Sequence, residues 1–298
     1  MTTHIPVLRN EAIEALLIND HDVVVDATLG GAGYAKDIVG KLSADGVFVG
    51  IDADAKAIAR AQLALKGAKP TTYLVNTNFR HIGVVLDELH IATVNKVVFD
   101  LGLSSYQLEE GERGFTFQKD EPLIMTFATE TLPHERTARD IVNEDSVEAL
   151  TTMLFTYGDE KYARRIATAI VSERAIAPIE TTGALVAIIE KAVPVVYKKQ
   201  RTHPATRTFQ ALRIAVNEEY DALTETLTTA ISRLSSKGRI AVVSFHSGED
   251  RIVKTIFREA AQNGSGVRVT KKPIVPRPEE VEHNPRSRSA KLRVFEAL

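Results

Sequence analysis

Short apolar runs alternate with longer amphipathic stretches over the first hundred residues. The apolar runs, rich in β-branched and aromatic residues, predict strands at 23–26, 47–51, 71–75 and 94–99. The stretches between them predict helices at 34–42, 53–66 and 81–89. Strands that alternate with helices favour a parallel sheet with right-handed crossovers. We therefore expect an α/β fold built on a doubly wound, mostly parallel sheet.

The pattern changes between about residues 104 and 204, where only helical periodicity is found. Amphipathic helices are predicted there at 146–155, 160–174 and 182–192. A long helical stretch follows at 206–234, and further strands are predicted at 238–245, 267–270 and 292–297. About a hundred helical residues form an inserted domain and not a loop. We expect a discontinuous sheet domain over 1–105 and 205–298, interrupted by a helical domain over 106–204.

Composition narrows the class of protein. The 298 residues are 44% hydrophobic and 26% charged, as in ordinary folded soluble proteins. No apolar run is long enough to cross a bilayer, and the N-terminus lacks a signal-peptide pattern. The absence of cysteine excludes disulfides, thiolate catalysis and cysteine-based zinc sites, and we expect no metal site. These features fit a cytoplasmic protein that does not contact membranes.

The net charge of −2 does not by itself indicate a nucleic-acid-binding protein. Two segments are nevertheless purely basic. Residues 198–213 hold five lysines and arginines, residues 285–293 hold four, and neither segment contains an acid. Each segment alone is typical of a solvated surface. Together they are compatible with one basic face that contacts phosphates.

Candidate ligand-binding groups follow three of the predicted strands. A glycine-rich turn, Gly30–Gly33, follows the first strand, Asp52 ends the second and Asp100 ends the fourth. Ligands of open parallel sheets bind at such strand ends, and glycine lets the backbone approach them closely. Asp52 lies 19 residues after Gly33, where a carboxylate can accept from two ribose hydroxyls. An adenosine-type ligand is favoured over the alternative of a tight turn with an exposed aspartate.

The turn distinguishes between two adenosine ligands. The segment 31–36, Gly-Ala-Gly-Tyr-Ala-Lys, lacks the third glycine of a nicotinamide-binding motif. S-adenosylmethionine has no pyrophosphate and does not need that motif. Asp26 and the turn offer partners for its amino-acid end, and Asn78–Phe79 offers a cover for adenine. The pattern favours S-adenosylmethionine, while a nicotinamide-dependent oxidoreductase remains an alternative.

Longer motifs cover nearly the whole chain in a fixed order. They are His4–Leu8, Asp26–Gly31, Asp100–Ser105 with Gln107–Leu108, Arg113–Phe115, Tyr157–Lys161, His203–Arg207 with Phe209–Ile214 and Val216–Asn217, Ser244–Ser247 with Glu249–Arg251, and Asn284–Arg286 with Arg288–Arg293. In these motifs the chain resembles the bacterial 16S ribosomal RNA (cytosine-N4) methyltransferases, the family of ribosomal RNA small subunit methyltransferase H. The resemblance is far more specific than the glycine turn alone.

The resemblance implies a Rossmann-like class I methyltransferase domain with an inserted helical domain for substrate recognition. It implies S-adenosylmethionine as the methyl donor and a cytidine of 16S rRNA, near the decoding centre of the small ribosomal subunit, as the substrate. The positions that contact the donor in the family correspond to Ala32, Gly33, Tyr34, Asp52, Phe79, Asp100 and Gln107, next to Gly30 and Gly31 of the turn. Whether the protein is a homodimer stays open.

Methyl transfer to an exocyclic amine requires that the amine be positioned and its hydrogens accepted. Asp100 is a candidate acceptor, although an acid at a strand end can also cap a helix. His246 is a candidate proton acceptor or phosphate contact, or else a structural hydrogen-bonding group. Candidate substrate contacts are Ser104, Ser105, Arg113 and Arg207, with Tyr106, Phe115 and Phe117 as aromatic partners for an unstacked base. We expect Arg251 to pair locally with Glu249 or Asp250.

The chain also departs from the family pattern near the expected site. Ala32-Gly33-Tyr34 replaces Gly-Gly-His, Tyr106 replaces proline and Gly248 replaces leucine. Residues 122–127 read Pro-Leu-Ile-Met-Thr-Phe in place of Pro-Leu-Asp-Met-Arg-Met, as if apolar contacts replaced an ion pair. These departures suggest a third hypothesis, a non-catalytic relative that binds RNA or the ribosome.

Overall fold

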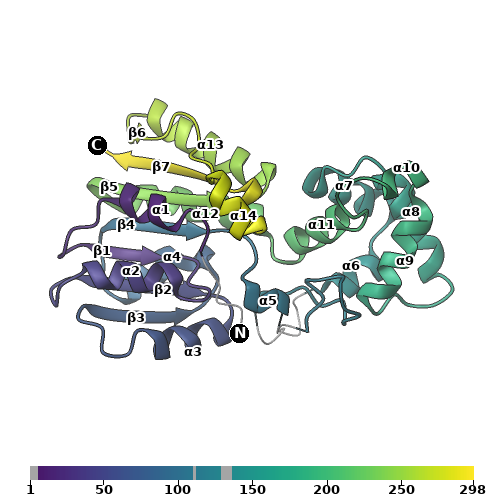
Figure 1. The fold of residues 1–298 in the computed structure, drawn as a ribbon, viewed down its shortest axis with the longest axis horizontal. Coiled ribbons are helices and arrows are strands. Elements are labelled where there is room, and N and C mark those ends of the chain that lie inside the picture. The colour runs from purple at the N-terminus through teal and green to yellow at the C-terminus, as the bar shows by residue number, and fades with distance from the viewer. Residues whose placement is uncertain (1–5, 110–111, 129–135) are drawn as a thin grey trace. The chain divides into compact units, whose positions relative to one another are not determined.

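The computed structural model describes residues 6–109, 112–128 and 136–298, which fold into two compact units (Figure 1). The first unit combines the chain up to Ser104 with the chain from Tyr220 onward. The second unit consists of Ser105–Glu219. The first unit is therefore discontinuous in sequence, and the second is inserted into it.

A seven-stranded sheet forms the first unit, in the order β3-β2-β1-β4-β5-β7-β6. The strands are β1 (Val23–Asp26), β2 (Val47–Asp52), β3 (Thr71–Asn76), β4 (Val94–Asp100), β5 (Leu234–Ser244), β6 (Gly266–Arg268) and β7 (Lys291–Ala297). The first five pair in parallel, whereas β7 is antiparallel to both of its neighbours. The predicted fold class, a doubly wound and mostly parallel Rossmann-like sheet, is confirmed.

Helices cover both faces of this sheet. One face carries α1 (Arg9–Leu16), α2 (Gly33–Lys41) and α3 (Ala55–Ala64), and the other carries α4 (Ile82–Glu88), α12 (Glu219–Arg233) and α13 (Ser247–Gln262). Successive strand residues point to opposite faces, so Val24 packs with the first set of helices and Val25 with the second. Both faces are buried, which explains the continuous apolar runs in the sequence. Short elements complete the unit: η1 (Phe79–His81), α14 (Pro278–His283) and η2 (Pro285–Ser289).

The second unit is helical in its described part. Its helices are α5 (Ser105–Glu109), α6 (Ala138–Glu144), α7 (Val147–Gly158), α8 (Ala163–Arg174), α9 (Thr182–Ala192), α10 (Val195–Lys198) and α11 (Thr206–Val216). Side chains of Thr137, Ser146 and Thr181 cap three of these helices by accepting from backbone N–H groups. Those caps fix where the helices begin.

The predicted helix over 206–234 is interrupted, and the expected boundary at 204/205 is wrong. Glu218 adopts a positive φ of 47° between α11 and α12. The Asn217 side chain accepts from the Phe127 N–H and donates to the Met125 carbonyl, both in the second unit. Because α11 packs against α7, it belongs to the second unit, and the chain enters the first unit only at Tyr220.

Within the three described ranges, no helix is both long enough and apolar enough to cross a bilayer.

Candidate active site

The order of the strands reverses between β1 and β4, and the candidate groups lie where these strands end. Both β2 and β4 pair with β1, with Asp26 opposite Gly50 on one side and Val98 on the other. Asp52 and Asp100 each lie two residues beyond those partners, at the last position of their strands. Parallel strands thus bring Asp26, Asp52 and Asp100 to one edge of the sheet.

The glycine-rich turn runs along this edge from β1 to α2. The Leu29 N–H donates to the Ile51 carbonyl, which ties the turn to β2. Gly30 has a φ of +49°, and a Cβ on Gly33 would lie 2.2 Å from Cγ of Pro6. Ala32, where the family has glycine, adopts a φ of +60° just before α2. Gly31 is half-buried between these positions, so the turn keeps a tight backbone path that is open to a ligand.

Asp52 holds the turn through its carboxylate. One oxygen accepts from the Gly30 N–H and the other from the Asp54 N–H, each at 2.8 Å. Burial raises the pKa of the Asp52 carboxyl, although these two hydrogen bonds act in the opposite direction. Each carboxylate oxygen can accept more than one hydrogen bond. The side chain can therefore also accept from the two hydroxyls of a ribose.

Asp26 is buried and Asp100 is half-buried, and each has one buried carboxyl oxygen that is unsatisfied. Oδ1 of Asp26 accepts from the Thr28 N–H, but Oδ2 of Asp26 and Oδ1 of Asp100 are buried without a hydrogen-bond partner in the described chain. Burial raises the pKa of Asp26 to about 7, and the neighbouring Asp52 adds to the shift. Burial, with Asp26 and Glu249 nearby, also raises the pKa of Asp100 well above its usual value.

The carboxyls of Asp26 and Asp100 favour a positively charged ligand. Leaving a buried acceptor unpaired costs about 1–3 kcal/mol, and a positive group would satisfy both acids at once. S-adenosylmethionine carries an ammonium and a sulfonium, so the residues present fit this donor. A nicotinamide dinucleotide would instead bring phosphates, which these acids disfavour.

His246 begins α13 and forms a capping box with Glu249. Its Nδ1 accepts from the Glu249 N–H at 3.4 Å, and Oε2 of Glu249 accepts from the backbone N–H groups of Phe245 and His246. Nε2 of His246 lies 3.1 Å from Oε1 of Glu249, yet it makes no hydrogen bond to any described residue. The ring is thus structural at Nδ1, while Nε2 has capacity for a further partner.

Glu249 is a site residue that the sequence analysis missed. It is 2% exposed, and its charge helps to raise the pKa of Asp100. The spacing of a capping residue and an acid three positions later could have identified it. The expected local pair with Arg251 is wrong: Asp250 instead pairs with Lys291 and Arg293 of β7. Strand pairing places β7 beside β5, which the sequence did not predict.

Two predicted donor contacts have structural partners of their own. Tyr34 is 3% exposed, and its hydroxyl donates to the Val7 carbonyl. Phe79 is half-buried and meets the edge of Phe99 at 6.2 Å between ring centroids. Asn78 caps η1 by accepting from the Arg80 N–H. The contacts of Tyr34 and Phe79 with a donor stay predictions.

The candidate substrate residues are divided between the two units. Ser104 closes the first unit near Gly30, with its Cβ 3.9 Å from the position of a Cβ on that glycine. Ser105, Tyr106 and Gln107 lie in α5 of the second unit. Ser104 therefore shares the edge with the glycine turn, and the contacts predicted for Ser105 and Gln107 stay predictions.

Arg113 and Arg207 bind backbone carbonyls within the second unit. Nη1 of Arg113 donates to the carbonyls of Thr126, Phe127 and Ala128. Phe115 stacks on Phe127, and Arg113 lies over the Phe115 ring. Nη1 of Arg207 donates to the Asp159 carbonyl at 3.0 Å. These contacts give both arginines a structural role, and their phosphate contacts stay predictions.

The departure at Gly248 has a structural explanation. A Cβ at this position would lie 1.8 Å from the hydroxyl of Tyr220, whose ring centroid is 5.9 Å from that of His246. The leucine usual in the family cannot fit while Tyr220 occupies this place. Tyr220 therefore fills space beside His246 that the family's leucine side chain would need.

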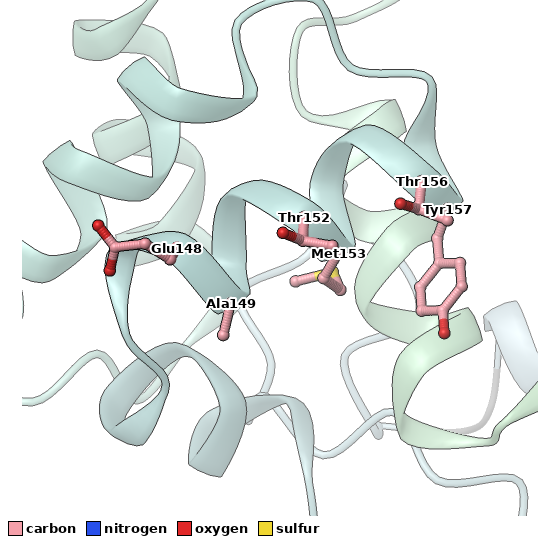
Figure 2. Close-up of a pocket in the computed structure, with 6 residues that line it drawn as sticks. All are labelled: Glu148, Ala149, Thr152, Met153, Thr156 and Tyr157. Carbon is pink, nitrogen blue, oxygen red and sulfur yellow. The ribbon is translucent and has the colours of Figure 1, made fainter.

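A separate depression of about 400 Å³ lies along α7 in the second unit (Figure 2). Its lining consists of Glu148, Ala149, Thr152, Met153, Thr156 and Tyr157. All six come from one helix, and none is a predicted site residue. This depression offers no catalytic arrangement comparable to the sheet edge.

Comparisons with known proteins identify the family of this chain. The MraW methylase family matches residues 1–298. Ribosomal RNA small subunit methyltransferase H of Clostridioides difficile (strain 630) is 44% identical over 99% of this chain and 99% of its own length. The protein of the same name from Brevibacillus brevis is 43% identical, over 99% and 98%. A solved rRNA methylase from Streptococcus thermophilus aligns with a TM-score of 0.44 at 12% identity, over 97% of this chain and 93% of that one.

These findings confirm the family resemblance that the sequence motifs predicted. They also confirm the predicted class of enzyme, a methyltransferase that uses S-adenosylmethionine. The roles of individual site residues stay predictions.

Proposed function

The chain belongs to the MraW methylase family, and from this premise we propose that it transfers a methyl group from S-adenosylmethionine to N4 of a cytidine in 16S rRNA. Full-length relatives named ribosomal RNA small subunit methyltransferase H support the choice of substrate. The target lies near the decoding centre of the small ribosomal subunit, and the enzyme works in the cytoplasm, where that subunit is assembled.

One observation carries the proposal: the buried, unsatisfied carboxyl oxygens of Asp26 and Asp100 beside the glycine turn. Asp26 and Asp100 create a site for positive charge, and Asp52 offers acceptors for a ribose on the neighbouring strand. A cation attached to a nucleoside meets both requirements. The same combination argues against the alternative of a nicotinamide-dependent oxidoreductase.

Residues of this edge would orient the two reactants. The donor supplies an activated methyl group on its sulfonium when bound. Asp52 holds the ribose hydroxyls, and Asp26 with the backbone of Gly30–Gly33 holds the amino-acid end. Positioning of this kind can contribute roughly 7–11 kcal/mol toward the barrier of a reaction between two molecules.

In this proposal, Asp100 accepts a hydrogen bond from the amine of the cytosine, supported by its buried, unsatisfied Oδ1. Accepting it draws the nitrogen lone pair out of conjugation with the ring and aligns it for attack. An ionised carboxylate accepts this hydrogen bond more strongly, whereas burial, which raises the pKa of Asp100, opposes its ionisation. His246 is the second candidate: because Nδ1 accepts a backbone hydrogen bond, Nε2 of the neutral ring carries the hydrogen and can donate to a phosphate oxygen.

The second unit is assigned to substrate recognition. The base must leave its stack before its amine can align, and unstacked bases in RNA are held by aromatic side chains. Phe117 is half-buried, with one ring face stacked on His203 at 4.7 Å between centroids, so only its other face could receive a base.

The decisive experiment supplies labelled S-adenosylmethionine and assembled small subunits that lack the modification. We expect label at a single cytidine, located by mapping the methylated RNA. Label only on protein, DNA or a small molecule would refute the assigned substrate. Absence of both methyl transfer and donor binding would favour the non-catalytic relative.

A further inference from the structure

The second unit carries a concentrated set of exposed cations. They come from two segments, one around the start of α8 and one around the end of α10. We call them the basic face: Lys161, Arg164, Arg165, Lys198, Lys199 and Arg201. All six are exposed. The first three were not identified in the sequence, because they lie far from the others along the chain.

Aromatic packing joins the two segments. The rings of Tyr162 and Tyr197 meet edge to face at 4.9 Å between centroids. The Tyr197 hydroxyl donates to Glu160 at 2.7 Å, and the Arg165 guanidinium lies 5.9 Å from the centre of the Tyr162 ring. These contacts fix the start of α8 against α10, so the six cations share one region of the surface.

Glu160, the acid next to Lys161 in the sequence, has partners of its own. Glu160 is fully buried and accepts from the Tyr197 hydroxyl and the Tyr162 N–H. Among the described residues, none of the six cations of the basic face forms an ion pair. The neighbouring Lys191 differs in this respect, since it pairs with Glu173.

We propose that the basic face binds the phosphate backbone of ribosomal RNA and anchors the substrate without reading its sequence. This inference rests on the proposed function, because that function supplies an RNA substrate. Exposed lysine and arginine side chains without ion-pair partners can replace the counterions around phosphates. The chain as a whole has a net charge of −2, so affinity for RNA must come from a local concentration of positive charge.

The test compares two variants with equal changes in charge. The first is K198A/K199A/R201A in the basic face. The control is K41A/K66A/K69A, which removes three exposed lysines near the opposite ends of the strands in the first unit. Binding of small subunits that lack the modification is measured at several salt concentrations, and S-adenosylmethionine binding by calorimetry reports an intact donor site.

Three lost phosphate contacts should reduce the slope of log K against log salt by about 2, and affinity at 0.1 M salt should fall at least tenfold. The control variant should keep the wild-type slope, and both variants should bind the donor as the wild type does. A basic-face variant with unchanged affinity and slope would overturn the inference. An equal loss in the control would also overturn it, because any positive charge would then suffice.

Two further results separate this inference from its alternatives. If wild-type protein neither binds nor methylates the subunits, the proposed function fails, and the inference fails with it. If the wild type methylates the subunits and the basic-face variant binds them as tightly as the wild type does, the inference fails while the proposed function stands. Wild-type binding to vesicles of phosphatidylglycerol and phosphatidylcholine as tight as binding to subunits would assign the basic face to anionic lipid and overturn the RNA anchor.

Discussion

Asp26→Asn should stabilise the ligand-free protein, and the gain should grow with pH. Folding raises the pKa of Asp26 from 3.8 to about 7, chiefly through burial. The folded protein therefore keeps a proton that the unfolded chain releases over this range. Stability falls as the pH rises from about 4 to 7, and the loss is complete above the folded pKa. Asparagine has no proton to lose, so it avoids this cost.

The size of the effect follows from the same values. Between pH 5 and pH 8, the wild type loses stability over about two pH units, from pH 5 to the folded pKa of Asp26 at about 7. At about 1.4 kcal/mol per unit, the stability difference between variant and wild type should increase by up to about 3 kcal/mol. The substitution keeps an Oδ1 that can accept from the Thr28 N–H, so the local turn is preserved.

Urea denaturation of both proteins at pH 5 and pH 8, without donor, measures this difference. Comparing the variant with the wild type at each pH cancels the titration of the remaining groups. Asp221→Asn, an exposed change in α12, serves as the control and should show a difference that does not vary with pH. An Asp26→Asn difference that is equal at the two pH values would refute the reasoning, since Asp26 would then be ionised in the folded protein throughout.

Three other predictions test the site and its surroundings. Asp52→Ala should weaken S-adenosylmethionine binding at least tenfold, because two charge-assisted hydrogen bonds from the ribose hydroxyls to the carboxylate are lost. RNA binding should stay intact. Equal losses of donor and RNA binding in calorimetry would contradict the ribose role. Wild-type donor affinity should rise about eightfold from pH 6.0 to 7.5 as Asp26 ionises through a pKa of about 7, whereas a flat profile would show that its ionisation is not required. Gly248→Ala should cost about 1–3 kcal/mol through overpacking against Tyr220. A Tyr220→Leu background should relieve most of that cost in thermal denaturation, and an unchanged cost would disprove the clash.

The sequence alone determined the sheet and the edge that holds the site. Val23–Asp26 and Val94–Asp100 form strands as their buried, β-branched patterns predict, because a strand covered on both faces needs continuous apolar residues. Asp52 and Asp100 could be placed at strand ends from the chain order alone. Parallel connection then requires that such ends meet at one edge.

Tertiary structure decided what those side chains can do. One oxygen each of Asp26 and Asp100 is buried and unsatisfied, and this burial depends on packing that no local pattern records. Glu249 reaches the site through a helix cap, and β7 enters between β5 and β6 by pairing distant segments. The break at Asn217 likewise depends on carbonyl and N–H partners some ninety residues away. Such long-range contacts set charge, burial and domain boundaries, whereas periodicity along the chain sets only the elements.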